Sequence, residues 1–270
     1  MPYVDAGGVK LFYESAGEGT PLILHAHHHL SWMPFQFPYF SQFYRVITLD
    51  RRGTGRSDDP PGPWTIADFA RDLRNLLDVL EIDKAIVGGN SLGGVISSQF
   101  GLDYPERALA LIIGHTTPWF WEIGIQWLKD QIALMKRNER VIVMQPRSYK
   151  WEEDGPPTVA PGFAETEIGR YVATLRSGLG NPAATIKMLE AMLGWDQRPR
   201  YPEMHKLEVP ALVIVGGNEP QKTIELSHEW HQQFKDSDYV ILPNTYHSAA
   251  AGNPIGWNAA VHGFLRRRGL

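Results

Sequence analysis

The fold of this chain is decided by the stretch Ala85-Ile86-Val87-Gly88-Gly89-Asn90-Ser91-Leu92-Gly93-Gly94-Val95-Ile96-Ser97-Ser98. A short apolar run leads directly into the pattern Gly89-x-Ser91-x-Gly93, and helix-like sequence follows at once. This order predicts a buried strand, a tight turn at Ser91 and a helix that begins there. We expect strained backbone angles at the turn. Side chains at positions 89 and 93 would collide there, so both positions need glycine.

Such a turn has chemical consequences for Ser91. The strand–turn–helix context makes Gly-x-Ser-x-Gly a nucleophile elbow, in which the serine hydroxyl stands clear of the sheet. The helix that starts at Ser91 points its unpaired N–H groups, and the positive end of its dipole, at any oxyanion that forms nearby. On the pentapeptide alone, a glycine-rich turn with an incidental serine is the alternative.

The composition limits the class of protein. A chain of 270 residues with 43% hydrophobic content can bury a full core as one large domain with an inserted subdomain. The net charge of -4 gives no electrostatic reason to expect nucleic acid or an anionic membrane surface as a partner. The absence of cysteine excludes disulfides, thiolate metal sites and a cysteine nucleophile. Residues 1–5 do not resemble a signal sequence, and no apolar run approaches the ~20 residues of a membrane span, so we expect a cytoplasmic protein.

Strands and helices alternate along most of the chain. Strands are expected at residues 3–4, 9–14, 21–25, 45–49, 85–90, 109–114, 211–216 and 239–242. Helices are expected near residues 38–43, 65–80, 91–104, 223–234 and 254–267. This alternation predicts an α/β protein with a mostly parallel, eight-stranded sheet that helices cover on both faces.

The periodicity changes after Thr117. Residues 118–200 are helical in places, rich in tryptophan and interrupted by Gly155-Pro156-Pro157. We interpret residues 118–200 as an inserted helical cap, or lid, and residues 1–117 and 201–270 as the core domain. The aromatic residues of a cap form its own core more often than they contact substrate. A pocket lined partly by Trp119 and Trp127 would nevertheless favour an apolar or aromatic substrate.

With these pieces in place, the chain resembles the α/β-hydrolase superfamily over nearly its whole length. The matching segments are the loop that starts at His25, Asp50-Arg51-Arg52-Gly53-Thr54-Gly55-Arg56-Ser57, the elbow at 89–94, Gly216-Gly217-Asn218-Glu219, and His247 after the last strand. Their order is the chain order Ser…acid…His of this superfamily. The resemblance implies the α/β-hydrolase fold, no cofactor, and a catalytic triad of Ser91, Glu219 and His247.

The acid of this triad has alternatives. Glu219 lies just past the strand that follows the cap, where relatives most often have aspartate. Glutamate is one methylene longer but still accepts a hydrogen bond from the far imidazole nitrogen. Asp196 and Asp50 are the other candidates for the acid. Asp50 is better suited to a structural role, in which its carboxylate fixes the backbone of its own loop. The strand ending at Gly114 supplies the acid in some relatives, but here it is followed by His115 and no carboxylate.

The run His25-Ala26-His27-His28-His29 departs from the superfamily, whose members usually have His-Gly there. The resemblance implies an oxyanion hole formed by the backbone N–H groups of His27 and Leu92, with His28 as the alternative to His27. His-x-His-x-His also suits a metal such as zinc, but it lacks the aspartate such runs usually include. We therefore expect no metal, and we expect one of these rings, such as that of His28, to line the substrate pocket.

The sequence thus predicts a serine hydrolase that cleaves an ester or lactone of a small hydrophobic molecule through an acyl-enzyme. Two alternatives stay open. One is a carbon–carbon bond hydrolase of ring-cleavage diketones, whose elbow is similar to Gly89-Asn90-Ser91-Leu92-Gly93-Gly94. The other is a ligand-binding homologue that turns over negligibly. We expect no nucleic-acid or membrane partner, and a monomer or homodimer.

Overall fold

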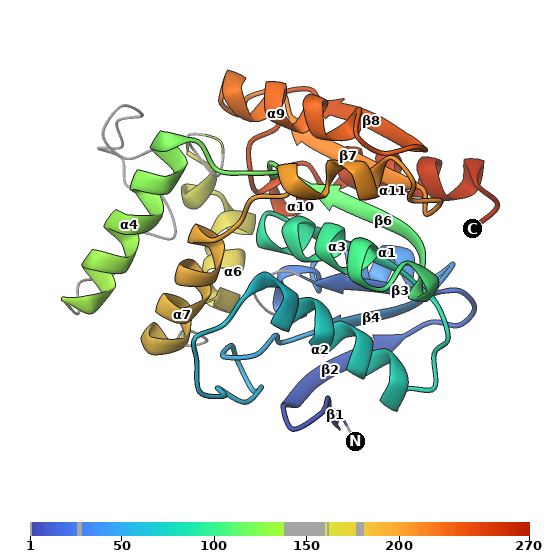
Figure 1. Ribbon diagram of the computed structural model, residues 1–270, viewed down its shortest axis with the longest axis horizontal. Coiled ribbons are helices and arrows are strands. Elements are labelled where there is room, and N and C mark those ends of the chain that lie inside the picture. Colours follow the sequence, from blue (N-terminus) through green and yellow to red (C-terminus); the bar gives the residue numbers. More distant parts are fainter. Residues whose placement is uncertain (1, 26–28, 138–159, 161, 177–180) are drawn as a thin grey trace.

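One sheet of eight strands forms the centre of the molecule (Figure 1). The structure, a computed structural model, describes residues 2–25, 29–137, 160, 162–176 and 181–270. The strands are β1 (Tyr3–Asp5), β2 (Lys10–Ala16), β3 (Pro21–His25), β4 (Arg45–Leu49), β5 (Ala85–Asn90), β6 (Ala108–Gly114), β7 (Ala211–Gly216) and β8 (Ser237–Leu242). Their order is β1-β2-β4-β3-β5-β6-β7-β8, and only the pairings of β2 are antiparallel. The predicted mostly parallel, eight-stranded sheet is confirmed.

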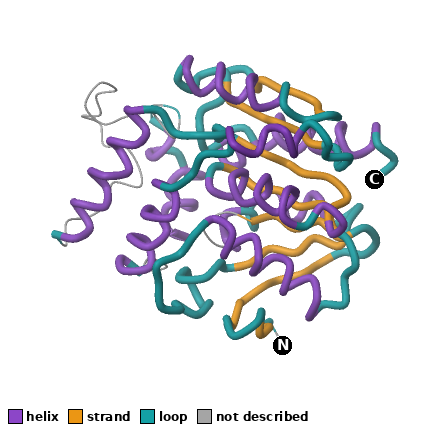
Figure 2. The backbone as a smooth tube through the Cα atoms, viewed as in Figure 1, coloured by secondary structure: helices purple, strands orange, loops and turns teal. Residues whose placement is uncertain are grey.

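Helices cover both faces of the sheet (Figure 2). The α-helices are α1 (Gln36–Phe40), α2 (Ile66–Val79), α3 (Leu92–Asp103), α4 (Glu122–Lys136), α6 (Glu167–Arg176), α7 (Pro182–Leu193), α8 (Tyr201–Met204), α9 (Gln221–His231), α10 (Ala249–Gly252) and α11 (Pro254–Arg267). Short 3-10 helices are η1 (His29–Ser31), η2 (Pro105–Arg107), η3 (Phe163–Glu165) and η4 (Arg198–Arg200). No helix in these described ranges is both long enough and apolar enough to cross a membrane.

The alternation of side chains along the strands builds two separate cores. Neighbouring residues in a strand point to opposite faces, so Leu111 and Ile112 of β6 belong to different clusters. The Leu111 cluster includes apolar side chains of α2, α3 and α9. The Ile112 cluster includes those of α1 and α11. A strand buried on both faces must be apolar throughout, which is why β3, β5, β6 and β7 read as continuous apolar runs.

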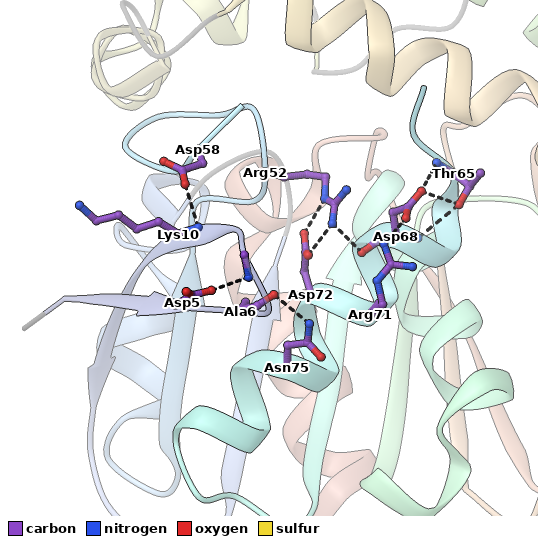
Figure 3. A network of polar contacts seen from close by, with 11 residues as sticks. Asp5, Ala6, Lys10, Arg52, Asp58, Thr65, Asp68, Arg71, Asp72 and Asn75 are labelled. Atoms are coloured by element: carbon purple, nitrogen blue, oxygen red, sulfur yellow. Dashed lines mark hydrogen bonds and ion pairs between the residues drawn. The ribbon is translucent and has the colours of Figure 1, made fainter. Parts of the chain in front are cut away.

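A buried ion pair fastens the loop after β4 to α2 (Figure 3). The guanidinium of Arg52 donates two hydrogen bonds to the carboxylate of Asp72, of 2.6 and 2.7 Å. It also donates to the carbonyl oxygen of Asp68, in the first turn of α2. Asp68 completes a capping box with Thr65, which satisfies backbone N–H groups where the helix begins. The loop therefore has a fixed position beside the helix.

Between β6 and β7 the regular elements among the described residues are helices joined by loops, apart from one isolated bridge between Trp119 and Asp196. Here α4 packs against α7, and α6 lies beside η1, which follows β3. In Figure 1, α4, α6 and α7 lie together at one end of the sheet. This segment therefore reaches the edge at which the parallel strands end.

Candidate active site

Ser91 occupies a strained turn between β5 and α3. Its φ of 55° and ψ of −122° lie outside the regions that side-chain-bearing residues ordinarily adopt. The N–H of Ser91 donates to the carbonyl oxygen of Gly114 at 2.7 Å, which ties the turn to the end of β6. The predicted strand, strained turn and helix are confirmed.

Neighbouring segments of the backbone lie too close to this turn for a side chain to fit at Gly89. A Cβ there would lie 2.2 Å from the carbonyl oxygen of His25 and 2.7 Å from the Cα of Gly93. The predicted need for glycine at position 89 is confirmed. The turn is also fixed from α11, because the indole N–H of Trp257 donates to Oδ1 of Asn90 at 3.0 Å.

Glu219 and His247 meet at the same edge of the sheet. Glu219 is buried on the turn after β7, and His247 lies on the loop after β8 with its side chain 31% exposed. Nδ1 of His247 lies 3.1 Å from Oε2 of Glu219. An ionised carboxylate only accepts hydrogen bonds, so Nδ1 donates and Nε2 is left to accept a proton.

The other oxygen of Glu219 meets a second imidazole. Oε1 lies 2.6 Å from Nδ1 of His115, and it also accepts from the N–H of Gly216 at 3.2 Å. The side chain of His115 is completely buried. The sequence motifs indicated no function for His115. Its place after β6, where some relatives carry the acid, indicated the edge of the sheet but not the contact with Glu219.

These neighbours keep Glu219 ionised. Burial by itself would raise the pKa of the Glu219 carboxyl group. The attraction of His247 and the hydrogen bonds from His115 and His247 outweigh burial and hold this pKa well below its usual range. At neutral pH the group is therefore a carboxylate, which stabilises a positive charge on a neighbouring imidazole.

The other two acid candidates are engaged elsewhere. Asp196 pairs with Arg198 at 2.6 Å, and its side chain is 38% exposed. Asp50 is buried, and its Oδ2 accepts from the backbone N–H of Arg56 at 3.1 Å. Of the three candidate carboxylates, Glu219 is the one that the structure brings within hydrogen-bond distance of His247.

In the run from His25 to His29, the structure describes the ring of His25. This ring is buried, and its Nε2 lies 3.1 Å from Oγ of Ser97 on α3. Burial, and secondarily the positive charge of Arg51, lower the pKa of His25 to about 3, so the ring is neutral near pH 7. His27 and His28 lie outside the described residues, so their roles stay predictions.

Leu92, the other expected oxyanion donor, is the first residue of α3. The first N–H groups of a helix have no acceptor within the helix, so the N–H of Leu92 can bind an anion. Its role in an oxyanion hole stays a prediction.

Trp119 and Trp127, the expected pocket residues, lie in the segment between β6 and β7. The guanidinium carbon of Arg198 lies 4.4 Å from the centroid of the Trp119 ring. Trp127 lies on α4, 37% exposed. The Trp119 ring therefore has a contact within its own segment, and the substrate roles of both residues stay predictions.

Comparisons with known proteins agree with this fold. A family model described as the alpha/beta hydrolase family matches residues 22–260. A protein of Azorhizobium caulinodans provisionally named carbamate hydrolase RutD is 27% identical, over 98% of this chain and 98% of its own. The 3-oxoadipate enol-lactonase 2 of Acinetobacter baylyi is 28% identical, over 88% of this chain and 85% of its own.

A solved structure supports the same conclusion about the fold. The enol-lactonase from Burkholderia xenovorans LB400 superposes with a TM-score of 0.79 at 24% identity, covering 98% of this chain and 100% of that one. The family match extends from β3 into α11 and includes the Ser91 turn, Glu219 and His247. The chain therefore belongs to the alpha/beta hydrolase family and is a hydrolase.

Proposed function

We propose that this hydrolase cleaves a carboxylic ester or lactone of a small hydrophobic molecule through an acyl-enzyme on Ser91. The observation that carries the proposal is the hydrogen bond between Glu219 and His247, at the sheet edge where the Ser91 turn also lies. A strained serine at a helix N-terminus and an imidazole oriented by a carboxylate are the parts that acyl transfer requires.

In the proposed mechanism, Nε2 of His247 takes the proton of the Ser91 hydroxyl as Oγ attacks the carbonyl carbon. The backbone N–H of Leu92, together with that of His27 or His28, stabilises the oxyanion. The protonated His247 then gives its proton to the leaving alkoxide, and an ester of Ser91 remains. Water repeats the sequence with His247 as base, which releases the carboxylic acid and restores the serine.

The proposed substrate class rests on two further observations. The similar protein of Acinetobacter baylyi is named an enol-lactonase, and lactones and esters share the carbonyl chemistry of this mechanism. The helical segment within residues 118–200 reaches η1 through α6, so we propose that it acts as a cap over the site. Apolar and aromatic side chains of this cap, including Trp119 and Trp127, would favour a hydrophobic substrate.

Active-site labelling combined with a substrate panel tests the proposal. A fluorophosphonate probe should label the wild-type protein and the Ser41→Ala control, whose substitution lies at the end of α1, but not Ser91→Ala. Ser91→Ala should also lose turnover of an aryl ester and of a lactone. Labelling that persists in Ser91→Ala would contradict the proposed nucleophile.

The same panel separates the alternatives. Turnover of a dienol diketone in preference to esters and lactones would favour the carbon–carbon bond hydrolase. Labelling of Ser91 without turnover of any substrate class would favour the ligand-binding homologue. Turnover of the ester or lactone, lost in Ser91→Ala, supports the proposal.

A further inference from the structure

His115 contacts the proposed catalytic acid although it is not a member of the proposed triad. We propose that His115 is a positioning residue, whose imidazole holds the Glu219 carboxylate where Oε2 accepts the hydrogen bond of His247. The proposal rests on the proposed function for the roles of Glu219 and His247. It adds a second histidine to the residues on which turnover depends.

The distances show which neighbour holds the carboxylate more closely. The contact of Oε1 with His115 is 2.6 Å, whereas that of Oε2 with His247 is 3.1 Å. Glutamate has one more rotatable bond than aspartate, so the backbone turn alone does not fix the orientation of its carboxylate. Two donors on Oε1, His115 and the N–H of Gly216, define that orientation and leave Oε2 for His247.

His115 is itself a rigid support. It follows β6, and its N–H donates to the carbonyl oxygen of Ile214 in β7 at 2.7 Å. Its φ of 52° is uncommon for a residue other than glycine, and such angles persist where the surrounding structure imposes them. The ring is completely buried. The position of the ring therefore depends on the ends of two central strands.

The hydrogen-bond pattern also defines which nitrogen of the His115 ring donates. Nδ1 must carry a proton, because the carboxylate can only accept. Nε2 is buried and has no hydrogen-bond partner among the described residues. The centroids of the two imidazole rings lie 6.4 Å apart, and each ring meets a different oxygen of Glu219.

Two substitutions separate the hydrogen bond from the volume of the ring. His115→Ala removes the donor, whereas the side-chain amide of His115→Asn places an N–H near the position of Nδ1, and asparagine tolerates a positive φ. We expect His115→Ala to lower kcat by roughly ten- to a hundredfold, the effect of misplacing a catalytic group. The KM for a small aryl ester should change by less than about twofold, since His115 does not touch the substrate. His115→Asn should recover most of kcat.

A double-mutant cycle tests whether His115 acts through Glu219. In a Glu219→Gln background, His115→Ala should change kcat by less than about twofold, because the carboxylate that His115 positions is already absent. A merely structural role predicts the same loss in both backgrounds. If His115→Ala does not fold by circular dichroism, His115→Gly replaces it, because glycine adopts a φ of 52° without strain.

The outcomes distinguish this inference from the proposed function. Full kcat in His115→Ala, or equal losses in both backgrounds, overturns the positioning role while Ser91 and Glu219 keep theirs. Activity that survives both Ser91→Ala and Glu219→Gln overturns the proposed function, and the positioning role with it. Loss in His115→Ala, recovery in His115→Asn and no further loss beside Glu219→Gln support the inference.

Discussion

The backbone of Gly216 lies so close to Thr245 that a Cβ on residue 216 would be 2.2 Å from the Thr245 carbonyl oxygen. That carbonyl also accepts a hydrogen bond of 3.0 Å from the N–H of Asn218. The loop that carries His247 is therefore seated directly on the turn that carries Glu219. The fit between the two segments determines how closely the carboxylate and the imidazole approach each other.

Gly216→Ala should move these two segments apart. The added methyl group cannot fit 2.2 Å from a carbonyl oxygen, so the loop of His247 must shift. We expect kcat for an aryl ester to fall by at least about tenfold, since small displacements of catalytic groups are costly. Gly252→Ala is the matched control, because a Cβ at Gly252 would meet no atom of the described residues within 4 Å. Equal kcat in the two variants would contradict this account of the loop.

Glu219→Gln should remove the acid while preserving its shape. The amide can present its NH₂ group to the imidazole and hold the unproductive tautomer of His247. A comparable acid-to-amide change in a serine protease lowers turnover by ~10⁴-fold. We expect at least ~10²-fold here, about 2.7 kcal/mol of barrier, measured as kcat for one ester at neutral pH. Glu219→Asp should retain part of the activity, limited by its shorter reach.

The other carboxylates supply the controls for this experiment. Asp196→Asn removes an exposed pair with Arg198 and should cost little turnover. Asp50→Asn should cost less turnover than Glu219→Gln, although it weakens the loop between β4 and α2. Near wild-type turnover in Glu219→Gln, together with collapse in Asp196→Asn, would place the acid between β6 and β7 instead.

The buried ring of His25 should make the stability of the protein depend on pH. Its pKa is lowered from 6.5 to about 3, so between these values the unfolded chain binds a proton that the folded chain does not. The unfolded state binds more protons, so the free energy of unfolding falls as pH falls through this window. We expect His25 to contribute a loss of about 2 kcal/mol from pH 7 to pH 5, measured by urea unfolding.

His25→Gln isolates this contribution. The amide of glutamine can donate to Oγ of Ser97 in place of Nε2 without titrating. Its free energy of unfolding should therefore vary less with pH than that of the wild type, whereas the exposed control His205→Gln should keep the wild-type slope. Identical slopes in the wild type and His25→Gln would show that the ring is not protected from protonation.

Asp72→Asn should destabilise the fold because it leaves the Arg52 guanidinium buried without its counter-charge. The two side chains are only 6% and 4% exposed, so water cannot replace the lost partner. Breaking such a pair from one side costs about 3 kcal/mol. The free energy of unfolding in urea provides the measurement.

An exposed ion pair serves as the control for that substitution. Glu208 pairs with Lys235 where both side chains are largely in solvent. Glu208→Gln should change the free energy of unfolding by less than about 1 kcal/mol. Similar losses for the two substitutions would contradict the role assigned to burial.

Local sequence predicted most of the sheet, because a strand buried on both faces must be apolar and is bounded by turn residues. The bounds of β3 and β4 match the expected ranges, and so does the end of α11 at Arg267. The first helix lies earlier in the chain than predicted. α1 begins at Gln36, whereas the helix was expected to begin near Pro38. The start is set by distant contacts: Nε2 of Gln36 donates to the carbonyl oxygen of Ala250 and to Oδ1 of Asn258.

Only those residues of the site that belong to short motifs, or that follow predicted strands in the expected order, could be predicted from the sequence. The motif at Ser91 and the positions of Glu219 and His247 after strands indicated one sheet edge. Helix α10 was not predicted, because its four residues are too few to show a helical periodicity in the sequence. The contact of His115 with Glu219 joins residues 104 positions apart, and no local signal encodes which of ten histidines faces which carboxylate.

The strand order has a consequence for how the molecule behaves at high concentration. An open sheet ends in strands whose outer N–H and C=O groups could pair with a second chain, and here those strands are β1 and β8. β1 offers only three residues. β8 carries Asp238, whose carboxylate is bound by Arg267 and Arg268 of the C-terminal segment. A short strand at one edge and bound charges at the other are features that oppose edge-to-edge pairing of two sheets.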